Sequence, residues 1–347
     1  MLVKREPRPI PGRIVTFLIG RADRDLTATD VVDIKALKSA PGYSDVIPKQ
    51  KVIKLERRMV IEKEVVFLVK TYPPHIVVVE ASLDRDDMLA SDALEIKRAL
   101  ITECRKVLAE FGCNKEFDEE YSVYCISDYS GDPEVYLSVS GDRVAALLKN
   151  EDQPLDDVEV SATLSSSLKY GKNDITIVDW DGAFIFDSTG DFKGDIELFE
   201  IANLQLLRYR VLDNELDRRL ERTLSLLKSS GDIPFFKSRE VRRVLRDIIE
   251  IRTQSILESE AVEHNIKLIG DWYSARLYSL IARKFHLDTW STDIKEKLDT
   301  LEDVYTMAAD NFSLSYRATI EFIILAGWFI LLLLYIGEFL MLKFFAQ

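Results

Sequence analysis

The C-terminal end of the chain constrains its fold most strongly, because it is almost entirely apolar. It reads IEFIILAGWFILLLLYIGEFLMLKFFAQ, with no charge between Phe322 and Gly337 and only Glu338 before Lys343. A helix needs about 20 apolar residues to cross a bilayer. The run therefore predicts a single transmembrane helix over 319–345, so late in the chain that it would act as a tail anchor. The alternative is a buried core helix, for which little chain remains to cover every side.

The rest of the chain is then expected to face the cytoplasm, as in a single-pass membrane protein with the lipid bilayer as a partner. The apolar stretch Ile14–Gly20 is too short for a secretory signal and lacks a small-residue cleavage site after it. The three cysteines, Cys104, Cys113 and Cys125, form no CxxC pair and are odd in number. This usage favours a reducing compartment over a disulfide framework.

Glu338 interrupts the apolar run, and two interpretations of it stay open. An ionisable residue inside a bilayer is costly and usually functional. Glu338 could lie at the headgroup level beside Lys343, or it could make an interhelix hydrogen bond within an oligomer.

The N-terminal half has the pattern of a mixed α/β domain. Residues 1–50 are rich in proline and loops, and residues 51–190 form the domain itself. Runs of β-branched residues predict strands, and apolar residues at helical spacing predict helices. The expected strands are Arg13–Ile19, Val65–Lys70, Ile76–Glu80, Tyr121–Ile126, Val158–Leu164 and a hairpin over Ile175–Phe186, and the expected helices are Leu83–Phe111 and Gly141–Lys149.

Residues 191–318 are predicted to form a helical domain that ends in a stem with heptad-like spacing. The expected helices before the stem are Gly194–Leu227, Ser238–Ile266 and Tyr273–Phe285. The stem carries apolar residues in steps of three and four, as a coiled-coil seam does. These are Trp290, Ile294, Leu298, Leu301, Tyr305, Ala308 and Phe312. The seam either packs within its own chain or forms a homo-oligomer. The expected fold is therefore α+β: a mixed α/β domain, a long-helix bundle and a single C-terminal transmembrane helix.

The charge balance and the scarcity of histidine exclude several functions. The chain has 59 acidic and 46 basic residues, for a net charge of −13, which disfavours nucleic acid as a partner. The three histidines, His75, His264 and His286, are too widely separated for a local metal site. No glycine-rich phosphate loop occurs either, so no cofactor or metal is expected.

One short motif has the residues of a catalytic site. Asp179-Trp180-Asp181-Gly182 resembles the nucleophile motif of haloacid-dehalogenase-type phosphatases, in which the first aspartate attacks a phosphoryl group beside Mg²⁺. Ala183 stands where that family usually has threonine, and the downstream chain is helical rather than supplying further motifs. The main interpretation is structural: Asp181-Gly182 is typical of a type I′ hairpin turn, which needs positive φ at both central positions.

The order of parts resembles the YagE-type family, which includes the eukaryotic "required for meiotic nuclear division" proteins and whose function is uncharacterised. The resemblance covers roughly residues 170–340 and would make this chain a divergent member. The matching parts are the hairpin Asp174–Asp187 around Gly182, the helices Ile196–Leu227 and Arg239–Ser259, the pair Leu277-Tyr278, the heptad segment Ile294–Leu301 and the tail Ile320–Ile324. The resemblance implies a membrane-attached, non-enzymatic and oligomeric role, and it transfers no catalytic residue.

These observations predict a membrane-anchored, cytosol-facing scaffold, not an enzyme, that self-associates through its C-terminal helices. One alternative is an ion channel, because CorA-type magnesium channels also join an α/β domain to a long helix and a membrane region. This chain lacks their second membrane helix and their Gly-Met-Asn loop. The other alternative is a Mg²⁺-dependent phosphatase that uses Asp179 and Asp181.

Overall fold

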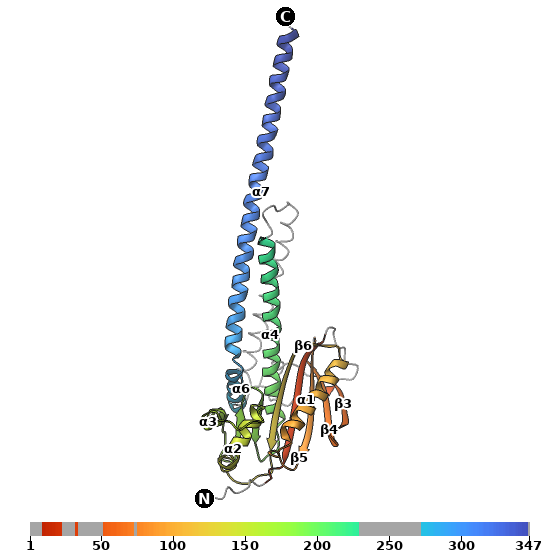
Figure 1. The fold of residues 1–347 in the computed structure, drawn as a ribbon, viewed down its shortest axis with the longest axis vertical. Helices are drawn as coiled ribbons and strands as arrows, with labels where there is room; N and C mark the ends of the chain where they lie inside the picture. Colours follow the sequence, from red (N-terminus) through yellow and green to blue (C-terminus); the bar gives the residue numbers. More distant parts are fainter. Residues whose placement is uncertain (1–8, 23–31, 34–50, 73–74, 229–271, 346–347) are drawn as a thin grey trace. The chain divides into compact units, whose positions relative to one another are not determined.

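The computed structural model describes residues 9–22, 32–33, 51–72, 75–228 and 272–345 (Figure 1). The chain divides into two compact units, and each is described by itself. The first comprises Met1–Leu212 and Glu258–Thr292, and the second comprises Asp213–Leu257 and Asp293–Gln347. The predicted helix Ser238–Ile266 lies outside the described residues.

The described residues of the first unit form a mixed sheet of nine strands in the order β2-β3-β4-β5-β1-β6-β9-β8-β7. Neighbouring strands of this sheet are antiparallel except β6 and β9, which run parallel. The strands are β1 Gly12–Ala22, β2 Val32–Asp33, β3 Lys51–Val60, β4 Lys63–Tyr72, β5 Ile76–Arg85, β6 Cys113–Ile126, β7 Ser167–Leu168, β8 Ile175–Val178 and β9 Gly182–Phe186.

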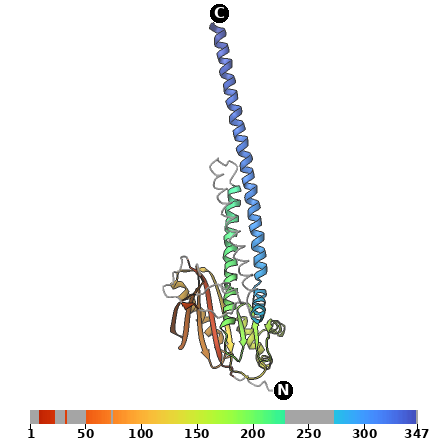
Figure 2. The same cartoon turned by 180° about the vertical axis from the view of Figure 1, so that it is seen from behind.

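The described helices are α1 Ala93–Glu110, α2 Glu134–Leu148, α3 Asp157–Ser165, α4 Lys193–Lys228, α6 Trp272–Lys284 and α7 Leu287–Phe345. Within the first unit, helices lie on both faces of the sheet (Figures 1 and 2). Neighbouring residues of a strand point to opposite faces. Val69 packs in the hydrophobic core that contains α1, whereas Lys70 binds Glu200 of α4. The sheet is therefore buried between α1 on one face and the first half of α4 on the other.

Burial on both faces explains why the central strand is apolar without alternation. In β1, the seven residues from Ile14 to Gly20 are all buried, and the sequence prediction of a strand over Arg13–Ile19 is confirmed. The predicted strands Val65–Lys70, Ile76–Glu80 and Tyr121–Ile126 are confirmed within β4, β5 and β6.

Two predictions in this domain need correction, one of a helix boundary and one of an element type. The helix predicted from Leu83 begins only at Ala93, because Leu83 to Arg85 continue β5 and pair with β1. The segment Val158–Leu164, predicted as a strand, lies in α3. The Asp156 side chain accepts a hydrogen bond from the Val158 backbone N–H at 2.9 Å and caps this helix. Val158 itself is largely exposed, so the β-branched residues of this segment do not mark a buried strand face.

The hairpin over Ile175–Phe186 is confirmed, but its predicted turn type is wrong. β8 pairs with β9 in antiparallel register, from Ile175 opposite Phe186 to Val178 opposite Ala183. Neither Asp181 nor Gly182 has a positive φ, so this is no type I′ turn. Gly182 is needed for a different reason: a Cβ at this position would lie 2.7 Å from the Ser122 backbone oxygen on the parallel neighbour β6.

The second unit contains the later parts of α4 and α7. Lys297 of α7 forms ion pairs with Asp213 (2.6 Å) and Asp217 (2.8 Å) of α4. Leu298 and Leu301 of α7 are buried, as is Leu216 of α4. The part of α7 from Lys297 to Leu301, which we call its lower part, is therefore packed within its own chain.

No helix in the described ranges is both long and apolar enough to traverse a membrane. The predicted transmembrane helix over 319–345 is therefore wrong, as are the tail anchor and the single-pass membrane localisation derived from it. The physical reason is length. The uncharged run from Phe322 to Gly337 rises only about 24 Å at 1.5 Å per residue, whereas the hydrocarbon core is about 30 Å thick.

Candidate functional site

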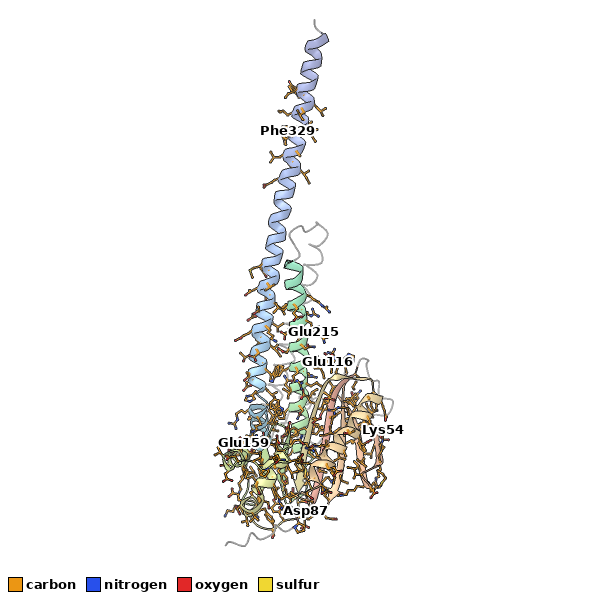
Figure 3. The ribbon with its side chains drawn as sticks, viewed as in Figure 1. Lys54, Asp87, Glu116, Glu159, Glu215 and Phe329 are labelled. Atoms are coloured by element: carbon orange, nitrogen blue, oxygen red, sulfur yellow. The ribbon has the colours of Figure 1, made fainter. Side chains whose placement is uncertain are left out.

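The Asp179 carboxylate is the buried centre of a polar cluster at the tip of the β8–β9 hairpin. It lies 3.0 Å from the Lys284 Nζ and 3.3 Å from the Lys149 Nζ. Lys149 also lies 2.7 Å from a carboxylate oxygen of Glu159 on α3, which is labelled in Figure 3. We call Asp179, Lys149, Lys284 and Glu159 the Asp179 cluster. Asp179 is only 3% exposed, so its charge depends on the two ammonium groups for compensation.

Local structure holds the Asp179 carboxylate in place. The Asp179 backbone N–H donates to the Gly182 carbonyl at 2.8 Å, which closes the hairpin. The Trp180 backbone N–H donates to Asp179 Oδ1 at 2.7 Å, and the Tyr121 hydroxyl donates to the Asp179 backbone carbonyl at 3.0 Å. Asp179 is therefore fixed by its own turn and by β6 before either lysine reaches it.

The two lysines come from the ends of two helices. Lys149 directly follows α2, and Lys284 is the last residue of α6. Asp179 therefore joins the hairpin to the end of α2 and to the corner between α6 and α7. At that corner His286 adopts a left-handed conformation with φ of 51°, and α7 begins at Leu287.

Aromatic side chains pack around the same corner. The Phe285 ring makes edge-to-face contacts with Trp180, at 5.7 Å between centroids, and with Tyr121, at 5.5 Å. Tyr121 also stacks on Phe199 of α4 at 5.1 Å. Such pairs contribute about 0.5–1.5 kcal/mol each beyond their burial. The start of α7 is thus fixed to the sheet by both charge and aromatic packing.

The cluster does not have the arrangement of a nucleophilic carboxylate. A nucleophile must reach its substrate, and a phosphatase aspartate must also face Mg²⁺. Both oxygens of Asp179 instead face lysine ammonium groups, and the side chain is buried. Burial raises the pKa of Asp181, and the Asp181 backbone oxygen accepts a hydrogen bond from the buried Lys97 at 3.4 Å. Among the described residues, no three His, Cys, Asp or Glu side chains are grouped to hold a metal ion.

The structure separates the residues of the predicted oligomer seam. Ile294, Leu298 and Leu301 are buried, and Trp290 is half-buried. The side chains of Tyr305, Ala308, Phe312 and Glu338 lie outside those that the structure describes, although these residues belong to α7. Cys104 and Cys125 are buried, and burial raises the pKa of both thiols, which keeps them protonated at neutral pH.

A hollow of about 640 Å³ lies at another end of the sheet, between β1, β3, β4 and β5. Its lining includes Arg13, Arg57, Glu64 and Asp84. These residues form the ion pairs Arg13–Asp84 and Arg57–Glu64, whose side chains are all more than half exposed. Exposed ion pairs of this kind contribute at most about 1 kcal/mol. The Asp179 cluster is therefore the more strongly organised polar site.

Comparison with known proteins identifies similar chains but no activity. A family model described as the N-terminal domain of uncharacterized protein MJ0711 matches residues 24–193. The chain is also 26% identical over 317 residues to uncharacterized protein MJ0711 of Methanocaldococcus jannaschii, a match that spans 91% of this chain and 94% of the relative. That relative is itself uncharacterised. No solved structure gives a significant match.

The family match includes three members of the Asp179 cluster, Lys149, Glu159 and Asp179, and ends before Lys284. These comparisons support similarity to a family of unknown function, and they do not confirm the YagE-type resemblance. The sequence motif points to Asp179 but gives no sign of Lys149 and Lys284. No local signal could have found them, because the three residues belong to separate elements that meet only in the fold.

Proposed function

We propose that the protein is a non-enzymatic scaffold that self-associates through the segment Ile323–Ile336, which we call the upper part of α7. The observation that supports this is the exposure of the apolar segment from Ile323 to Ile336. Its twelve large apolar side chains are between 45% and 74% exposed. Phe329, one of them, projects from the ribbon in Figure 3. Successive residues of a helix are about 100° apart, so these side chains cover every side of α7.

An exposed apolar surface of this size is typical of an interface. Patches on soluble monomers rarely exceed a few hundred Å². If about half of the twelve side chains lie on one side and each loses roughly 100 Å², a second copy covers about 600 Å² per chain, close to the ~800 Å² of a standard interface. Further copies would cover the remaining sides. A second copy of this chain suits the surface because its own α7 offers an apolar helix of the same length.

The lower part of α7 is a poorer candidate for the interface. Leu298 and Leu301 are already buried within the chain. A charged substitution at either would damage the second unit itself, by lost apolar burial and by desolvation of the new group. The proposed interface is therefore limited to Ile323–Ile336.

The Asp179 cluster supports a scaffold rather than a catalyst because its ion pairs hold elements of the fold together. It connects the hairpin to α2 and to the corner from which α7 starts. The resemblance to the YagE-type family, which implies a non-enzymatic and oligomeric role, agrees with this and is part of the proposal.

The test is the molar mass of the full chain in solution, measured by light scattering over a range of concentrations. We expect the wild type to exceed the 39.8 kDa of one chain. Leu331→Glu with Leu334→Glu places two charges on one side of the exposed segment and should lower the mass toward one chain. Thr306→Glu, at an exposed position of the same helix, is the matched control and should leave the mass unchanged.

Circular dichroism should show that all three proteins remain folded. A wild type that is monomeric at every concentration would contradict the proposal. So would a folded Leu331→Glu, Leu334→Glu protein whose mass equals that of the wild type.

A further inference from the structure

The first half of α4 contacts the sheet through buried charges as well as apolar side chains. Lys70 of β4 lies 2.6 Å from Glu200 of α4 and 2.9 Å from Glu80 of β5. The Tyr72 hydroxyl donates to the other oxygen of Glu200 at 3.3 Å. We call Lys70, Tyr72, Glu80 and Glu200 the Lys70 cluster. Glu200 is fully buried, and Lys70 and Tyr72 are nearly so.

The Lys70 cluster contains more carboxylates than cations. Glu80 and Glu200 share the one ammonium group of Lys70, and Glu197 is buried one turn earlier on the same helix. Like charges in a site of low dielectric disfavour simultaneous ionisation, so such a site tends to retain a proton. Tyr72 stays a neutral donor here, because burial raises its pKa.

A second buried carboxylate contacts α4 ten residues later. Glu119 of β6 is buried and forms an ion pair with Arg210 of α4. Ten helical residues span about 15 Å, so the two contacts hold α4 at separate points. Asp118 and Glu120 flank Glu119 on its strand, and both of them pair with Arg105 of α1.

The pKa values of Glu200 and Glu119 are shifted in the same direction by the same cause. Burial raises the pKa of Glu200 to about 7, although Lys70 opposes the shift. Burial likewise raises the pKa of Glu119 to about 7, against the opposing effect of Arg210. Lys70 remains cationic throughout this range, because the two glutamates raise its pKa and outweigh the effect of burial.

We propose that Glu200 and Glu119 form a proton-operated latch, which holds the first half of α4 on the sheet more firmly as the pH falls from 8 to 6. The sign follows from linkage. A carboxyl group that binds its proton more tightly when α4 is docked stabilises the docked state. This stabilisation is fully present below the ordinary pKa of the group, 4.5, and is lost as the pH rises through the raised pKa of about 7. The docking equilibrium should weaken roughly tenfold per carboxylate between pH 6 and pH 8, and so about 100-fold for the two together.

The test is hydrogen–deuterium exchange of α4 in the full chain, read by mass spectrometry over residues 193–212 at pH 6, 7 and 8. Exchange times are scaled to the intrinsic rate at each pH. In the wild type, protection of this segment should fall as the pH rises. Glu200→Gln with Glu119→Gln, which cannot ionise, should remove this dependence. Asp84→Asn, in an exposed ion pair on β5, is the matched control and should keep it.

Protection in the wild type that is independent of pH, or that rises with pH, would overturn the latch. A pH dependence that persists unchanged in the folded double variant would do the same. If the double variant does not fold, the wild-type profile and each single glutamine variant still decide the question.

Discussion

The interior of the first unit and the upper part of α7 differ in which kind of side chain is buried. In the first unit, Lys70, Asp179 and Glu200 are charged residues that lie buried beside oppositely charged groups. In α7, the residues from Ile323 to Ile336 are apolar and exposed. The comparison teaches that residue type does not decide burial alone. What decides it is whether another element of the fold approaches that position.

The largest effect should come from removing the shared cation of the Lys70 cluster. Lys70→Met keeps much of the side-chain volume but leaves Glu80 and Glu200 as unpaired carboxylates beside each other. Breaking a buried ion pair in this way costs about 3–5 kcal/mol. We expect that loss in the free energy of unfolding, measured with urea at pH 8.

The matched control is Arg57→Met, which breaks an ion pair whose side chains are both more than half exposed. It should cost less than about 1 kcal/mol. If the two variants lost equal stability, the contrast between buried and exposed charges would not hold in this protein.

Asp179→Asn should have the next largest effect, and it tests the Asp179 cluster. The amide keeps the size of the side chain but leaves Lys149 and Lys284 without a carboxylate. We expect a loss of about 2–4 kcal/mol, because both lysines are partly exposed and can recover some hydration. Thermal unfolding of the variant measures this loss. A melting temperature equal to that of the wild type would show that the cluster does not hold the α6–α7 corner.

The smallest effect compares two glycines, one in each region. Gly182→Ala places a Cβ 2.7 Å from the Ser122 backbone oxygen in the sheet, and we expect it to destabilise the protein by about 1–3 kcal/mol. Gly327→Ala lies in α7, where nothing stands within 4 Å of the added atom. Alanine is favoured over glycine within a helix, so this variant should gain about 0.5–1 kcal/mol of helix stability. Chemical denaturation measures the change in the free energy of unfolding for each variant. A change of the same sign in both would contradict the comparison.

Much of the fold could be predicted because its signals are local. The apolar run in β1, the β-branched runs in β4 and β5 and the hairpin around β8 and β9 all appeared as strands. The prediction for Val158–Leu164 failed because its β-branched residues suggested a strand, whereas the cap at Asp156 favours a helix. The membrane helix failed because no helix among the described residues combines the length and the apolar character that a bilayer requires.

The candidate site was predictable only in part. The Asp179 motif stood out from its neighbours, and its interpretation as structural rather than catalytic remains a prediction. Its partners carry no periodic or motif signal. Glu200 and Lys70, which form another buried ion pair, are separated by 130 residues in sequence. Ion pairs of this kind leave no pattern in a single sequence, because each charged residue alone looks like a solvated one.

By itself, the sequence determined the strands β1, β4 and β5, the β8–β9 hairpin and the long helix α4, because the spacing of apolar residues reflects the geometry of each element. Only the tertiary structure decided which charges are buried, why Gly182 has no side chain, and which part of the α7 apolar surface stays exposed. These properties depend on the approach of elements distant in sequence. The Ser122 oxygen excludes a Cβ at position 182, and the ends of α2 and α6 bring two lysines to Asp179. Such approaches follow from the packing of the sheet and its helices, which no local pattern records.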